Sequence, residues 1–188
     1  MPSLSQDPFE IEIFVRLAQS SGVMSYLEIG ARDGGCFEKM VQALPKGSRN
    51  VALDLPGGAW GRKGTDKILI KTINELRDNG YNVDVVISDS HDPATVDTVR
   101  RLAPVDLIFV DGDHRYEAVL QDWQNYRGMA RMIAFHDING DGVVSKHGDY
   151  LVEVPKLWNV IKTQHPYVEI INPLDKFGIG VVWPSLVF

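Results

Sequence analysis

Residues 104–111 are PVDLIFVD, an almost uninterrupted apolar run that begins at a proline and ends on a carboxylate. Such a run is typical of a strand that is buried on both faces, as in a parallel sheet. On both sides of it, apolar segments of strand length alternate with segments of helical periodicity. This alternation predicts an α/β fold built around a doubly wound sheet.

The remaining elements follow from the same periodicities. Strands are expected at residues 25–30, 50–54, 82–88, 104–110 and 129–135, with a closing antiparallel pair at 167–171 and 178–183. Asp7 and Asp92 each precede a proline and are expected to cap helices, as Asp113 is before Arg115. The first helix is expected to bury Phe9, Ile13, Phe14 and Leu17, and the polar segment 139–149 to form a loop over the acceptor.

Size and charge restrict the class of protein. The chain has 188 residues, about one domain's length, and a formal net charge of −6, which argues against binding along a nucleic-acid backbone. The single cysteine, Cys36, cannot form an internal disulfide and fits a reducing compartment. Neither a signal peptide nor a membrane span is recognisable. We therefore expect one cytoplasmic domain, residues 1–188, with residues 1–24 as an N-terminal cap and neither nucleic acid nor membrane as partner.

Polar residues follow the expected strands at their carboxyl ends, which is where open α/β sheets bind ligands. In chain order they are Glu28 with Gly30, Asp54, Asp89 with Ser90, Asp111 with His114, and His136 with Asp137. Because the carboxyl ends of parallel strands share one edge of a sheet, we expect these side chains to gather on one rim.

The first strand ends in a glycine turn that lets the backbone approach a ligand closely. Asp54 ends the next strand, at the spacing where an acid meets ribose hydroxyls in dinucleotide-binding folds. The dinucleotide fingerprint itself is absent, because Arg32 stands where the second glycine would be. A carboxylate at Glu28 suits a cofactor with a cationic head, such as S-adenosylmethionine, better than it suits a pyrophosphate.

From about Ser25 onward, the pattern resembles the class I S-adenosylmethionine-dependent methyltransferases. Residues 27–30 (LEIG) look like their first motif, Asp54 like the ribose-binding acid, and residues 88–90 like the segment beside the adenine. Residues 106–119 (DLIFVDGDHRYEAV), 133–137 (IAFHD) and 178–182 (GIGVV) are similar to the small metal-dependent O-methyltransferases of the macrolide-sugar and cephalosporin-pathway type. The resemblance implies a Rossmann-like sheet of seven strands in the order 3-2-1-4-5-7-6, with the last strand antiparallel.

The resemblance also implies roles for single residues. The cofactor would be held by Glu28, Gly30, Asp54, Asp89, Ser90 and Asp111. Asp111, His136 and Asp137 would bind a divalent metal, Mg²⁺ first, with Mn²⁺, Fe²⁺ or Zn²⁺ admitted by the imidazole. The related catechol and caffeoyl-CoA enzymes usually have Asp-Asn where this chain has His136-Asp137, which leaves the number of ligands open. His114 stands where those families often carry a lysine and would act with Asp111 in catalysis, as the general base.

The main hypothesis is therefore an S-adenosylmethionine-dependent O-methyltransferase that acts on a small-molecule hydroxyl. Three alternatives stay open on the sequence: a metal-dependent hydrolase that uses the same acids and histidines, an NAD-dependent oxidoreductase, and a non-catalytic cofactor-binding protein. His136 also fits a hydrogen-bonded structural histidine. The short N-terminal cap implies an acceptor pocket that is open, or that a neighbouring subunit of a homo-oligomer completes.

Overall fold

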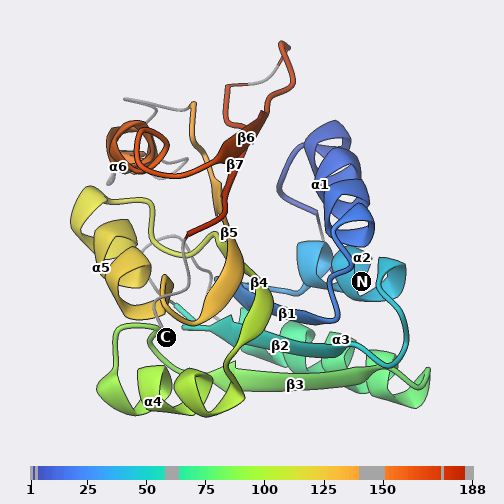
Figure 1. Ribbon diagram of the computed structural model, residues 1–188. Helices are drawn as coiled ribbons and strands as arrows, with labels where there is room; N and C mark the ends of the chain where they lie inside the picture. Colours follow the sequence, from blue (N-terminus) through green and yellow to red (C-terminus); the bar gives the residue numbers. More distant parts are fainter. Residues whose placement is uncertain (1, 3, 58–63, 140–150, 175, 185–188) are drawn as a thin grey trace.

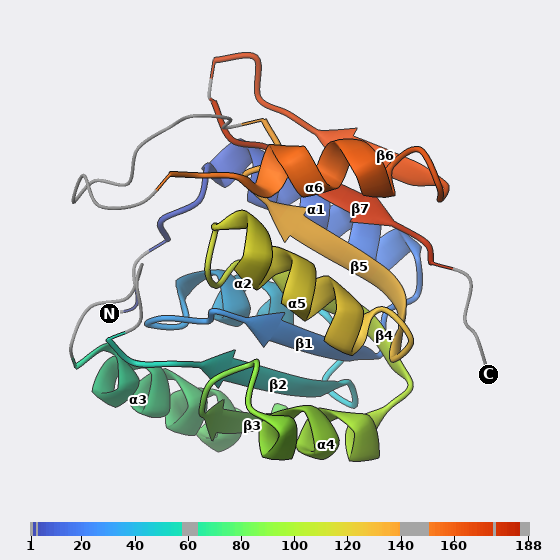
Figure 2. The ribbon, with the colours of Figure 1, turned by 90° about the vertical axis from the view of Figure 1, so that its left-hand side faces the viewer.

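The computed structural model describes residues 2, 4–57, 64–139, 151–174 and 176–184. These residues form one sheet of seven strands in the order β3-β2-β1-β4-β5-β7-β6 (Figures 1 and 2). The strands are β1 Ser25–Ile29, β2 Arg49–Asp54, β3 Asn82–Ile87, β4 Val105–Val110, β5 Ala130–His136, β6 Tyr167–Ile170 and β7 Ile179–Val182. Only β7 runs antiparallel to its neighbours, β5 and β6. The predicted α/β fold, strand order and antiparallel last strand are confirmed.

Helices cover both faces of the sheet (Figure 1). They are α1 Pro8–Ser20, α2 Gly35–Ala43, α3 Thr65–Asp78, α4 Pro93–Leu102, α5 Tyr116–Tyr126 and α6 Val154–Ile161. Side chains alternate along β4: Leu107 and Phe109 pack into the core beneath α1, α2 and α3, whereas Ile108 and Val110 pack beneath α4, α5 and α6. The apolar run of β4 therefore fills two cores, which is why it is almost uninterrupted.

The expected caps are present at two of three positions. Asp7 accepts hydrogen bonds from the backbone N–H groups of Phe9 and Glu10, each at 3.0 Å, and Asp92 accepts one from Ala94 at 2.8 Å. The prediction that Asp113 caps α5 is wrong, because Arg115 occupies the N-cap position. Asp113 instead accepts a hydrogen bond from the N–H of Arg115.

The buried face of α1 differs from the expected one. Phe9 and Ile13 are 50% and 36% exposed, whereas Ile11, Phe14 and Ala18 are buried together with Glu10. Glu10 turns inward because its carboxylate accepts hydrogen bonds from the N–H groups of Asn172 at 2.9 Å and Gly178 at 3.2 Å. These bonds tie α1 to the β6–β7 hairpin, a tertiary effect that periodicity does not reveal. No helix among the described residues is long and apolar enough to cross a membrane.

Candidate functional site

The carboxyl ends of β1, β2, β4 and β5 meet at one edge of the sheet, and a glycine allows them to approach. Gly30 has φ of +88°, and a Cβ atom added to it would lie 2.3 Å from the carbonyl oxygen of Asp111. Its N–H donates to the carbonyl of Leu53 at 2.8 Å, while the N–H of Asp111 donates to Ile29 at 2.9 Å. Only glycine lets the turn after β1 pass this closely between β2 and β4.

Asp54 offers an unused acceptor at this edge. Its Oδ1 accepts a hydrogen bond from the N–H of Arg32 at 2.8 Å, and its buried Oδ2 has no partner among the residues that the structure describes. Burial raises the pKa of Asp54 to about 6, against the lowering effect of the Arg32 N–H and charge. Arg32 itself adopts a φ of +52°, so the turn is shaped to present its N–H to Asp54. A buried oxygen left unpaired in this way suits a ligand hydroxyl.

The segment that contains Asp89 and Ser90 begins next to β2. The N–H of Ser88 donates to the carbonyl oxygen of Asp54 at 3.0 Å, which places the start of this segment next to β2. The hydroxyl of Tyr126 donates to the carbonyl of Ser90 at 2.6 Å and thereby joins the segment to α5.

The side chain of Glu28 is buried and hydrogen-bonded within the chain. Its side chain accepts a hydrogen bond from the hydroxyl of Tyr26 at 2.5 Å, and it is 1% exposed. Burial raises the pKa of Glu28 to about 8, helped by the charge of Asp111 and opposed by the hydrogen bond from Tyr26. The role expected for Glu28, a charged partner for a cationic cofactor, stays a prediction.

Asp111, His114, His136 and Asp137 form a tight group that we call the His–Asp cluster. His114 Nδ1 lies 2.8 Å from Asp137 Oδ2, and its Nε2 lies 3.9 Å from Asp111 Oδ1. His136 Nδ1 lies 2.7 Å from Asp137 Oδ1 and 3.2 Å from Asp111 Oδ1. Asp137 adopts a φ of +61°, a conformation that an aspartate tolerates in a turn. The predicted meeting of β4 and β5 residues is thus confirmed.

The cluster balances its charges internally. Burial alone lowers the pKa values of His114 and His136, but the facing carboxylates outweigh burial and raise both, that of His136 strongly. The two imidazoles in turn lower the pKa of Asp137 despite its burial. The ionised form of Asp137 is therefore favoured, and it faces two imidazoles that readily hold a proton.

The expected metal site is not formed by this arrangement. Two carboxylates and an imidazole are suitable donors for a divalent ion, but they point at one another as hydrogen-bond and ion-pair partners. No group of three or more His, Cys, Asp or Glu side chains among the described residues is placed so that it could hold a metal ion. The predicted metal role of Asp111, His136 and Asp137 therefore stays a prediction that this geometry does not support.

Sequence reasoning missed Gln6, which reaches the His–Asp cluster from the segment before α1. Its side-chain amide Nε2 donates to Asp111 Oδ2. The opposite amide atom, Gln6 Oε1, is buried and has no partner among the described residues, and the same holds for His136 Nε2. Asp7 accepts a hydrogen bond from the side chain of Asn172 at 3.3 Å, which helps to hold this segment in place. No local pattern in the sequence identifies such a contact.

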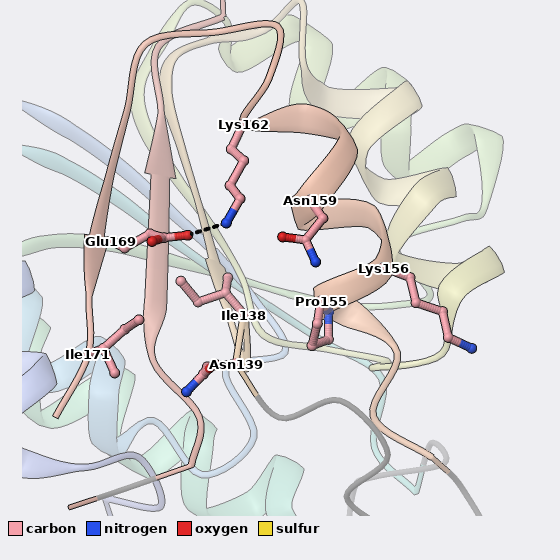
Figure 3. A pocket seen from close by; sticks show the side chains of 8 residues that line it. All are labelled: Ile138, Asn139, Pro155, Lys156, Asn159, Lys162, Glu169 and Ile171. Carbon is pink, nitrogen blue, oxygen red and sulfur yellow. Dashed lines mark hydrogen bonds and ion pairs between the residues drawn. The ribbon is translucent and has the colours of Figure 1, made fainter. Parts of the chain in front are cut away.

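A small pocket lies between α6, the end of β6 and the segment that follows β5 (Figure 3). It has a volume of about 260 Å³ and is lined by Ile138, Asn139, Pro155, Lys156, Asn159, Lys162, Glu169 and Ile171. Lys162 pairs with Glu169 at 2.9 Å, and Lys156 with Glu153 at 2.5 Å, so the lining presents mainly amide groups and paired charges. Its first two lining residues directly follow Asp137 in the chain. The acceptor loop expected at 139–149 lies, apart from residue 139, outside the described residues.

Residues 27–138 match the model of a protein family described as "Methyltransferase domain". An uncharacterized protein of Acanthamoeba polyphaga mimivirus is 30% identical over 104 residues, which are 55% of this chain and 45% of that protein. The alignment therefore spans about half the length of the curated relative.

Solved structures with the same fold include several methyltransferases. A candidate caffeoyl-CoA O-methyltransferase from Staphylococcus aureus superposes with a TM-score of 0.73 at 12% identity, covering 96% of this chain and 85% of that one. The Bacillus cereus O-methyltransferase in complex with S-adenosylhomocysteine gives 0.67 at 18% identity, covering 97% and 84%. The tomaymycin-synthesis O-methyltransferase from Streptomyces achromogenes, in complex with S-adenosylmethionine, gives 0.65 at 14%, covering 98% and 83%. At these identities the likeness establishes the fold.

Proposed function

Since this chain belongs to the methyltransferase-domain family and has the fold of the class I methyltransferases, we propose that it transfers a methyl group from S-adenosylmethionine to a hydroxyl of a small molecule. The observation that carries the proposal is the shared edge. Asp54, with its unpaired buried oxygen, ends β2, and the His–Asp cluster lies at the ends of β4 and β5, so both stand at the same edge of one sheet with β1 between them. The part of the edge at Asp54 suits a cofactor, and the part at the His–Asp cluster suits acid–base chemistry.

The cofactor would lie across the glycine turn after β1. Asp54 Oδ2 would accept a hydrogen bond from a ribose hydroxyl, and Asp89 with Ser90 would flank the adenine. Gly30 and the backbone of Asp111 would leave room for the methionine part, since no side chain fills the turn there. Solved relatives of the same fold contain S-adenosylmethionine or S-adenosylhomocysteine, which supports this choice of cofactor.

His114 would act as the general base. Asp137 accepts the Nδ1 proton of His114 at 2.8 Å, a contact that fixes the tautomer and leaves Nε2 as the basic nitrogen. As the acceptor oxygen attacks the methyl carbon, the carbon–sulfur bond breaks, its electrons pass to sulfur and S-adenosylhomocysteine leaves. The hydroxyl proton passes to Nε2, and Asp137 stabilises the resulting imidazolium. The chain's main task is alignment, because the sulfonium is already a good leaving group.

Metal assistance is not needed for this sequence of steps. His136 lies within ion-pair distance of both Asp111 and Asp137, so it can supply a counter-charge while His114 is neutral. The proposal therefore expects turnover to be unchanged after exhaustive dialysis against a chelator. Loss of turnover on chelation, with recovery on adding Mg²⁺ or Mn²⁺, would instead assign the cluster as a metal site.

Release of S-adenosylhomocysteine in the presence of a panel of phenols, sugars and hydroxy acids tests the proposed activity. Thermal-shift measurements with S-adenosylhomocysteine and NAD come first, because a ligand that binds only the folded state raises its stability. The proposal expects a rise with S-adenosylhomocysteine alone. A rise with NAD alone would favour the oxidoreductase alternative.

A further inference from the structure

A second histidine–aspartate pair lies outside the His–Asp cluster, between the segment after β3 and helix α5. His91 Nε2 lies 3.2 Å from Asp122 Oδ1 and 3.1 Å from the carbonyl oxygen of Ala118, both on α5. The N–H of His91 also bonds Asp89 Oδ1 at 2.9 Å, so the turn of residues 89–91 is internally braced. Together with the hydrogen bond from the Tyr126 hydroxyl to the Ser90 carbonyl, these contacts hold residues 89–91 against α5.

Asp122 is a buried acid with a single ion-pair partner. Its side chain is 1% exposed, and His91 is its only ion-pair partner among the described residues. Asp122 also interacts with the side chain of Ser90, so this one carboxylate holds two consecutive residues of the segment, Ser90 and His91. The titratable groups that face His91 are Asp122 from α5 and, at 3.8 Å, Asp89 from its own segment.

The segment that this pair holds adjoins the candidate cofactor site. Ser88 bonds the backbone of Asp54, and Asp89 and Ser90 follow directly in the chain. A shift of residues 89–91 away from α5 would therefore alter the wall beside Asp54. The pair acts on the site through the backbone, without touching the cofactor itself.

We propose that His91 and Asp122 form a latch that, when His91 is protonated, holds residues 89–91 in the position that closes the adenine side of the cofactor site. This inference rests on the proposed function, because it takes the adenine of S-adenosylmethionine as the ligand of that wall. His91 and Asp122 are positioning residues in this account.

The direction of the pH dependence follows from the two titrations. Contact with Asp122 raises the pKa of His91 although burial opposes it, and burial raises the pKa of Asp122. In both cases the folded state binds more protons than the unfolded state, so stability falls as pH rises. The contribution of His91 is complete below its ordinary pKa and is lost as pH rises through its raised pKa. The latch is therefore closed below the ordinary pKa of histidine and opens as pH rises through the raised pKa of His91.

Calorimetric titration with S-adenosylhomocysteine at pH 6 and pH 8.5 measures the latch. The ratio of the two dissociation constants also contains other titrating groups, so the comparison is between variants. We expect His91→Gln to bind S-adenosylhomocysteine more weakly than wild type at pH 6. The ratio of its dissociation constants at pH 8.5 and pH 6 should be about fivefold smaller than in wild type, the size of a modest coupling between sites. His91→Lys, which stays charged, should keep tight binding at both pH values. His165→Gln is the control, since His165 packs on Trp123 of the same helix and makes no ion pair among the described residues.

Equal pH ratios in wild type and His91→Gln would overturn the latch. The melting temperature without ligand gives a second reading: it should fall less between pH 6 and pH 8.5 in His91→Gln than in wild type. A failure of S-adenosylhomocysteine to bind any variant would overturn the proposed function. In that event the melting temperatures still decide whether His91 and Asp122 form the charged pair.

Discussion

Asp54 has one oxygen held by the chain and one available to a ligand, which makes it the sharpest single-residue test of the cofactor site. Asp54→Ala should weaken S-adenosylhomocysteine binding at least tenfold, because each lost charge-assisted hydrogen bond contributes roughly 1.5–3 kcal/mol. Calorimetry measures the change, with Asp84→Ala as the control, an exposed acid of β3. Equal affinity in Asp54→Ala and wild type would remove Asp54 from the site.

The proposed role of His114 as general base predicts a specific pH dependence of turnover. The neutral imidazole is the active form, and the carboxylates raise its pKa, so kcat should rise with pH through a value above the ordinary 6.5. His114→Gln should lower kcat about 10²- to 10⁴-fold and abolish this rise, while cofactor affinity stays close to that of wild type. A variant with the same pH–rate profile as wild type would contradict the assignment of His114 as base.

We expect Gln6 to contribute to binding of the acceptor and not to binding of the cofactor. Its amide nitrogen is bonded to Asp111, so its unpaired oxygen is available to a hydroxyl of the acceptor. Gln6→Met keeps the length of the side chain and removes both hydrogen-bonding atoms. We expect kcat/KM for the acceptor to fall about tenfold, the effect of one neutral hydrogen bond, with S-adenosylhomocysteine affinity unchanged. An unchanged kcat/KM would leave Gln6 with a structural role alone.

At the scale of elements, α1 owes its place to the buried carboxylate of Glu10. Glu10 accepts hydrogen bonds from the backbone N–H groups of Asn172 and Gly178. In Glu10→Gln, the amide NH₂ would face one of these N–H groups, and two donors would then oppose each other. We expect a loss of about 1–3 kcal/mol in the free energy of unfolding, the cost of an unsatisfied buried donor. Denaturant unfolding measures it, against Glu12→Gln on the exposed face of the same helix. Equal losses in the two variants would contradict the inward role of Glu10.

The elements and the site differ in how far the sequence determines them. Strand-end acids such as Asp54, Asp111 and Asp137 could be located from the sequence because an apolar strand followed by a carboxylate is a local pattern. The inward turn of Glu28 toward Tyr26 and the contact of Gln6 with Asp111 could not, since each joins residues whose distance depends on packing. The prediction that Phe9 and Ile13 are buried is wrong for the same reason. The hydrogen bonds between Glu10 and the β6–β7 hairpin help to set the rotation of α1 about its axis.

At the scale of the whole molecule, the parallel strands collect their functional residues at one edge because helices return the chain to the opposite edge after each strand. Asp54, the 89–91 segment and the His–Asp cluster belong to different strand ends, yet they share that edge. The strand order was implied by resemblance and is confirmed. The site therefore depends on the intact sheet, and Asp111 at its centre contacts β1 through Gly30 and the segment before α1 through Gln6.

The most direct test of the central claim is calorimetric titration of the full chain with S-adenosylhomocysteine. We predict saturable binding of one molecule per chain, with affinity reduced at least tenfold in Asp54→Ala. Absence of saturable binding up to about 1 mM, a concentration at which even a weak cofactor site would fill, would contradict it.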